Sequence, residues 1–115
     1  MINIIQGAQR YFTFSTPVNG YAQCSQIVVI IKDKNSPNKI VAMYAKVTAG
    51  LTGYGTVEAA VGSDINFRIF LTAVQSKALA GDYAVEISRT IAGVKMPVYK
   101  NKIADFLTVE KTDIP

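Results

Sequence analysis

The sequence contains no histidine, no tryptophan and a single cysteine, Cys24. A catalytic thiol needs a neighbouring base such as histidine, and a zinc site usually needs several histidine or cysteine ligands. Neither chemistry is therefore expected. One cysteine cannot form an internal disulfide, which favours folding in a reducing compartment. We expect Cys24 to pack as a small hydrophobic side chain.

Acidic residues are also few, and the eight aspartates and glutamates are scattered along the chain. General acid/base catalysis needs two acids held at a fixed spacing, and no such pair stands out. Asp33, Lys34 and Asn35 resemble the start of a calcium loop, but the glycine and the distal glutamate of that motif are missing. The sequence therefore predicts a protein that is not an enzyme and that has no metal ion or cofactor.

Long hydrophobic runs are absent as well. The longest, residues 27–31, is far shorter than a membrane span. The first seven residues lack the basic segment and the long apolar stretch of a signal peptide. We expect a protein without a membrane segment, made in the cytoplasm of the cell that produces it.

Half of the 115 residues are hydrophobic, only 17% are charged, and tyrosine, phenylalanine, valine and isoleucine are frequent. This composition favours a compact β domain, and the length fits one domain over residues 1–115. Alternating apolar and polar residues predict strands at 2–5, 10–15, 26–32, 40–47, 56–58, 65–71, 83–90, 94–99 and 103–110.

One helical segment, residues 72–80, interrupts this series, and Thr72 and Gln75 have the spacing of a capping box. Seven to nine short strands, separated by turns and joined by one short crossover helix, are typical of an immunoglobulin-like β-sandwich. We therefore predict an all-β protein with this fold.

The entry to the strand at 83–90 carries a motif of such sandwiches. Leu79, Gly81 and Tyr83 have the spacing of a tyrosine corner, in which the tyrosine hydroxyl bonds to upstream backbone. Leu79 would fill the core and Gly81 would allow the sharp bend. The same pattern also occurs by chance at strand entries.

The apolar run at 27–31 does not alternate, although a sandwich strand normally buries only one face. We expect both faces of this strand to be covered, by the N-terminal strand, by sister copies or by another protein. Val29, Ile30 and Ile31 are the candidate interface residues.

Positive charge is concentrated in the first half of the sequence. Residues 1–57 contain five basic residues and only one acidic residue, Asp33. Lys32, Lys34 and Lys39 lie in one predicted loop. This cluster is either an anion-binding patch or, as we favour, the solvated tip of a hairpin. Nucleic-acid surfaces usually carry more arginine and a wider basic stripe.

Five segments carry a resemblance to a known family: IIQG at 4–7, YFTF at 11–14, INFRIFL at 65–71, LAGDYAVEI at 79–87 and DFLTV at 105–109. In this order the sequence resembles small immunoglobulin-like domains of tailed bacteriophage virions, such as the N-terminal domain of baseplate upper proteins. It differs in lacking a following receptor-binding or coiled-coil segment, which leaves its place in the particle open.

The resemblance implies a non-enzymatic structural or assembly protein of the virion, in a baseplate, tail, neck or head. It would be assembled in the host cytoplasm, would contact other virion proteins and would form homo-oligomers. One alternative is a carbohydrate- or cell-surface-binding module, which would normally need tryptophan or several tyrosines on one face. The other is an OB-like nucleic-acid binder, for which only Tyr44 and Tyr54 are suitable stacking residues.

Overall fold

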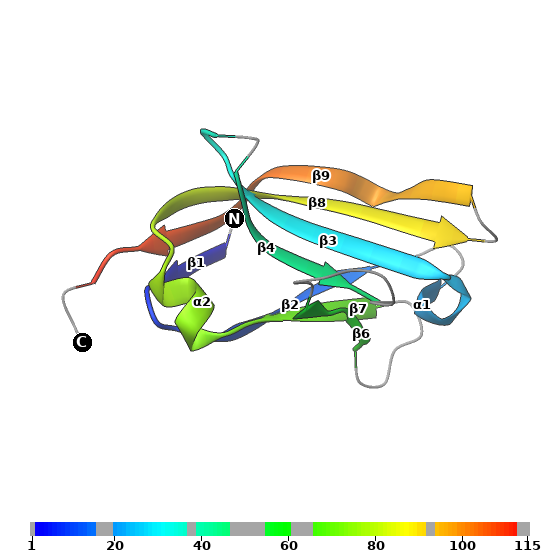
Figure 1. The fold of residues 1–115 in the computed structure, drawn as a ribbon, viewed down its shortest axis with the longest axis horizontal. Helices are drawn as coiled ribbons and strands as arrows, with labels where there is room; N and C mark the ends of the chain where they lie inside the picture. The colour runs from blue at the N-terminus through cyan, green and yellow to red at the C-terminus, as the bar shows by residue number, and fades with distance from the viewer. Residues whose placement is uncertain are drawn as a thin grey trace.

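The computed structural model describes residues 2–15, 20–36, 39–46, 55–60, 66–91 and 94–112. They form nine strands and two short helices: β1 (Ile2–Ile5), β2 (Arg10–Ser15), α1 (Gly20–Gln23), β3 (Gln26–Asp33), β4 (Ile40–Ala45), β5 (Gly55–Thr56), β6 (Glu58–Ala59), β7 (Asn66–Leu71), α2 (Ala73–Lys77), β8 (Gly81–Ile91) and β9 (Val94–Glu110). The strands form two sheets that lie one above the other, with α1 and α2 at opposite ends (Figure 1). The predicted all-β sandwich is confirmed.

One sheet has six strands in the order β1-β9-β8-β3-β4-β5, and the other has three in the order β2-β7-β6. Neighbouring strands are antiparallel except in the pairs β1/β9 and β4/β5. The largest differences from the prediction are that one continuous strand, β9, replaces the two predicted at 94–99 and 103–110, and that a second helix, α1, is present.

The core lies between the inner faces of the two sheets. On β7, every second residue is buried, and the side chains between them are half-buried, as the alternation predicted. Completely or almost completely buried side chains from both sheets meet there: Phe12, Ile27, Val29, Ile31, Phe67, Ile69, Leu71, Val85, Ile87, Leu107 and Val109. Each buried aliphatic or aromatic side chain stabilises the fold by about 1.5–3 kcal/mol.

The prediction for the apolar run in β3 was wrong for two of its three residues. Val29 and Ile31 are completely buried in the core, so neither side chain can contact a partner. Ile30 points to the opposite face, where it is half-buried. The strand lies inside its sheet, between β8 and β4, and β1 pairs with β9 at the edge of that sheet and therefore does not cover β3.

The short helix α1 is held by a distant side chain. The ammonium group of Lys46 donates to the carbonyl oxygens of Tyr21 at 2.7 Å and Cys24 at 2.6 Å. It also lies 4.4 Å from the centroid of the Tyr21 ring. A positive charge at a helix C-terminus is favourable because the carbonyl oxygens there carry partial negative charge.

Residue Gln6 joins three segments that are far apart in the sequence. Its backbone N–H donates to Glu110 and its Nε2 donates to the Leu79 carbonyl, at 2.9 and 2.7 Å. Its Oε1 accepts from the backbone N–H of Thr112 at 3.2 Å. The end of β1 is thereby fixed to the end of β9 and to the crossover that precedes β8.

That crossover contains α2, which begins with the predicted capping box. The Thr72 hydroxyl accepts from the Gln75 backbone N–H, and the Gln75 side chain accepts from the Thr72 backbone N–H. The helix ends at its C-cap, Ala78, earlier than predicted, and Gly81 then opens β8 with a φ of +109°. Residues with a side chain rarely adopt this conformation.

The tyrosine-corner residues lie together at the start of β8. The Tyr83 hydroxyl accepts from the Ala80 backbone N–H at 2.9 Å and donates to the Ala80 carbonyl at 3.1 Å. Leu79 and Tyr83 are both buried. A single hydroxyl therefore satisfies both backbone groups of one residue in the bend.

The chain changes sheets at Val57, between β5 and β6. The Val57 side chain is buried, its backbone N–H donates to the Ala45 carbonyl at 3.0 Å, and its carbonyl accepts from the Tyr21 hydroxyl at 3.1 Å. The one strand predicted at 56–58 is therefore two strands of two residues, one in each sheet.

We expect Val29→Lys to unfold the domain, because a charge in the core costs several kcal/mol of a total stability of about 5–15 kcal/mol. Ile30→Lys should stay folded, since residue 30 faces outward. Circular dichroism and size-exclusion chromatography of both variants test this. Loss of structure in both would mean that the two faces of β3 are equally essential.

We expect Tyr83→Phe to lower the free energy of unfolding by about 1–2 kcal/mol, because both backbone groups of Ala80 lose the hydroxyl of the buried Tyr83 as their partner. Urea denaturation measures this loss. Tyr11→Phe is the control, because it removes an exposed hydroxyl and should change stability by less than about 0.5 kcal/mol. Equal midpoints for the two variants would contradict a structural role for the Tyr83 hydroxyl.

Candidate functional site

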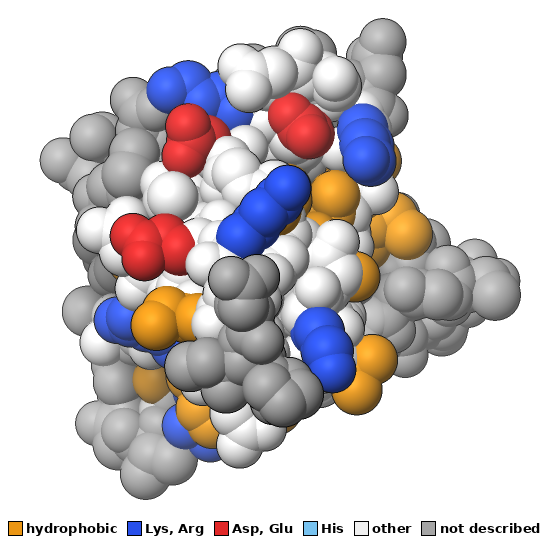
Figure 2. All heavy atoms as spheres, turned by 90° about the vertical axis from the view of Figure 1, so that its left-hand side faces the viewer, with side chains coloured by type: hydrophobic (Ala, Val, Ile, Leu, Met, Phe, Trp, Pro, Cys, Tyr) orange, Lys and Arg blue, Asp and Glu red, His pale blue; other side chains and the backbone are white. Residues whose placement is uncertain are grey.

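The three lysines considered as a basic patch have different surroundings in the structure. Lys32 makes an ion pair with Glu86 on the outer face of the six-stranded sheet, while Lys34 and Lys39 are exposed around the hairpin tip. The Asp33 carboxylate accepts from two backbone N–H groups within this tip. Acidic and basic side chains are interspersed on the molecular face shown in Figure 2. The hairpin tip is therefore a mixed surface.

The residues first considered for chemistry have structural positions. Cys24 is buried and belongs to the hydrophobic core. Within the described ranges, no three histidine, cysteine, aspartate or glutamate side chains are grouped so that they could hold a metal ion. In the same ranges, no helix has the length and hydropathy needed to cross a membrane.

A pair of aromatic side chains lies on the outer face of the three-stranded sheet. Tyr11 on β2 and Phe70 on β7 are direct register partners, and their ring centroids are 4.7 Å apart at an interplanar angle of 44°. Both point outward because their neighbours along the strands, such as Phe12 and Ile69, fill the core. Tyr11 is 47% exposed, so this face presents an aromatic surface to solvent.

An ion pair adjoins the aromatic pair. The Arg68 guanidinium carbon lies 4.0 Å from the Tyr11 ring centroid, and Arg68 Nε donates to Glu58 Oε1 at 2.7 Å. Glu58 on β6 is the register partner of Arg68. The stacked guanidinium holds the Tyr11 ring in place, and the paired charges cancel.

A pocket of about 300 Å³ opens beside these residues. β6 has two residues and pairs with Phe67 and Arg68, and among the described residues no strand pairs with the β7 edge beyond them. Residues from both sheets and from the start of α2 surround the pocket. They are Tyr11, Tyr44, Gly55, Thr56, Glu58, Phe70, Thr72 and Gln75.

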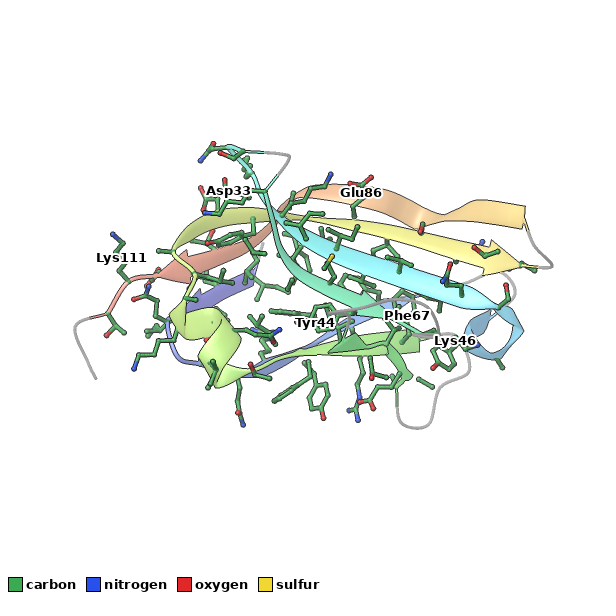
Figure 3. The ribbon with its side chains drawn as sticks, viewed as in Figure 1. Asp33, Tyr44, Lys46, Phe67, Glu86 and Lys111 are labelled. Atoms are coloured by element: carbon green, nitrogen blue, oxygen red, sulfur yellow. The ribbon has the colours of Figure 1, made fainter. Side chains whose placement is uncertain are left out.

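Tyr44 forms the buried end of this pocket. It points from β4 into the space between the sheets (Figure 3) and is 3% exposed. Gln75 Oε1 accepts from the Tyr44 hydroxyl at 3.4 Å and from the Thr72 N–H and hydroxyl at 2.9 and 3.2 Å. These bonds fix the amide, and its Nε2 donors have no partner among the described residues.

The residue opposite the Tyr44 ring must be glycine. A Cβ atom on Gly55 would lie 2.8 Å from Tyr44 Cδ1, closer than two carbon atoms can approach. Burial raises the pKa of Tyr44 from its ordinary value of 10.0 to about 12, although the bond to Gln75 acts in the opposite direction. Tyr44 is therefore a neutral hydrogen-bond donor throughout the physiological pH range.

A second hollow, of about 380 Å³, lies near the turn between β1 and β2. It is lined by Asn3, Ile4, Ile5, Ala8, Gln9, Arg10 and Glu110. No aromatic side chain is among these residues. The pocket beside Tyr11 and Phe70 therefore combines more kinds of contact, and we take it as the candidate site.

The sequence alone did not identify Tyr11 and Phe70 as parts of one site. The sequence signal that could have identified the pair is that Tyr11 and Phe70 each alternate with core residues along their strands, so each aromatic side chain faces outward. The missing information was that β2 and β7 are neighbours in register. The Tyr44 side chain, considered for stacking on nucleic acid, is buried at the end of the pocket.

No protein-family model and no curated protein matches the sequence. Solved structures do match. The catalytic module of the glycogen-degrading pneumococcal virulence factor SpuA aligns with 79% of this chain at 18% identity and a TM-score of 0.50. The Group B Streptococcus pullulanase SAP aligns with 83% at 13% identity and a TM-score of 0.51.

The matched part is 10% of the length of either enzyme structure. Identities this low show a shared fold and nothing more. This chain therefore has the fold of a small β-module that also occurs within large bacterial enzymes.

The raised pKa of Tyr44 predicts a loss of stability between pH 10 and 12. In that range the folded chain keeps the Tyr44 proton while the unfolded chain releases it, so rising pH favours unfolding. Urea midpoints measured across this range should fall more steeply for the wild type than for Tyr44→Phe. Parallel slopes would contradict the assignment of Tyr44 as a buried neutral donor.

Proposed function

We propose that this chain is a non-catalytic module that binds neutral carbohydrate at Tyr11, Phe70 and the adjoining pocket. The observation that carries the proposal is an exposed aromatic pair beside a pocket with polar side chains. The C–H faces of a sugar ring are apolar and pack on aromatic rings, while its hydroxyls need both donors and acceptors. Gln75 Nε2 is a donor, and the Glu58 carboxylate is an acceptor.

The charge of the site supports a neutral ligand. Glu58 and Arg68 neutralise each other at 2.7 Å, so an anionic ligand would have to compete with a carboxylate for the guanidinium. A neutral ligand can accept from the remaining guanidinium N–H groups and leave the ion pair intact.

The fold likeness suggests which carbohydrate to test first. The matched enzymes are a glycogen-degrading protein and a pullulanase, and one pullulanase structure contains maltotetraose. An α-glucan of the glycogen type is therefore the first ligand class to test. Because the likeness is one of fold, binding has to be measured on this chain itself.

We expect the full chain to bind glycogen in affinity electrophoresis and a linear malto-oligosaccharide in calorimetry. Tyr11→Ala and Phe70→Ala should each weaken binding by about fivefold or more, since an aromatic contact contributes about 1 kcal/mol. Val74→Ala is the control, because Val74 is 82% exposed on α2 and does not line the pocket. Wild-type affinity in both aromatic variants, or no binding by the wild type, would refute the proposal.

A virion structural protein is the second candidate. The observation that favours it is an apolar strip on the outer face of the six-stranded sheet, where Val28, Ile30 and Met43 are all half-buried. Ile30 and Met43 are register partners, so the strip is continuous. Sister copies or other virion proteins are the proposed partners. Size-exclusion chromatography of Ile30→Lys, described above, also tests whether this strip mediates assembly.

A further inference from the structure

The pocket beside Tyr11 and Phe70 is surrounded by segments that run in different directions. Thr56 and Glu58 come from the segment that changes sheets, Thr72 and Gln75 come from the crossover, and Tyr11 comes from an edge of the three-stranded sheet. A groove along a sheet face would instead be lined by parallel rows of neighbouring strands and would be open at both ends. The arrangement here is a cup.

The cup has a buried end and room for little more than one sugar ring. Tyr44 closes it with 3% exposure, and Gly55 lies directly against the Tyr44 ring. Its volume of about 300 Å³ is at the lower limit of small-molecule pockets, which span about 300–1,000 Å³. A residue inside a sugar chain would need two ways out, one for each of its neighbours.

From this geometry we propose that the cup receives a single terminal residue of a carbohydrate chain, so that the module recognises chain ends. The inference rests on the proposed function and narrows it. The hydroxyls of the terminal ring reach the Gln75 Nε2 donors and the Glu58 carboxylate. Tyr11 and Phe70, at the exposed side, pack against the ring or against the residue attached to it.

Linear and cyclic oligosaccharides of equal size separate this inference from the proposed function. Maltoheptaose has two ends, and cyclomaltoheptaose has the same seven units and no end. In calorimetry with the full chain, we expect maltoheptaose to bind at least tenfold more tightly than the cyclic form. Equal affinities would overturn end recognition but leave carbohydrate binding intact. Failure of both sugars and of glycogen to bind would overturn both proposals.

A pair of variants tests whether the end occupies the cup. Thr56→Phe adds a ring to an exposed wall residue and should lower the affinity for maltoheptaose at least tenfold. Val74→Phe adds the same ring outside the cup and should leave the affinity within twofold of the wild type. Circular dichroism checks that both variants are folded. Undiminished binding by a folded Thr56→Phe variant would overturn the assignment to this pocket.

Discussion

The passage of the chain from one sheet to the other at Val57 governs the arrangement around the candidate site. The buried Val57 side chain and its two bonded backbone groups fix the crossing point, and in the described part of the chain two residues pair on either side of it. Among the described residues, β6 therefore covers only part of the β7 edge. The uncovered edge of β7 makes room for the pocket, and the crossing segment itself supplies two of the residues that line it, Thr56 and Glu58.

The alternation of apolar and polar residues predicted the strands well wherever one face of a strand packs against the core. The bounds of β1 and β2 are those expected, and β3 is one residue longer, because apolar residues at every second position report burial directly. The helix α1 was missed since Lys46, a distant residue, holds it. The apolar run in β3 was wrongly interpreted as an interface at Val29 and Ile31. Its outward side chains, such as Ile30, are already half-buried by the neighbouring strands β8 and β4. Local pattern does not specify such long-range contacts.

The candidate site depends on the same long-range information. Tyr11 and Phe70 form a pair only through the register of β2 and β7, two strands that are far apart in the sequence. The partner of Lys32, Glu86, also lies on a distant strand, which is why a basic cluster in the sequence becomes a mixed surface in the fold. A pocket formed by the shortness of β6 leaves no trace in hydrophobic periodicity.

The parallel pairing of β1 with β9, together with the Gln6 clamp, has a mechanical consequence. Tension between the start of β1 and the end of β9 would pull the two strands along their axes in opposite directions. The bonds of this ladder and those of Gln6 would then be strained together in shear, instead of breaking one after another as in a zipper. A domain connected in this way resists extension through its terminal strands.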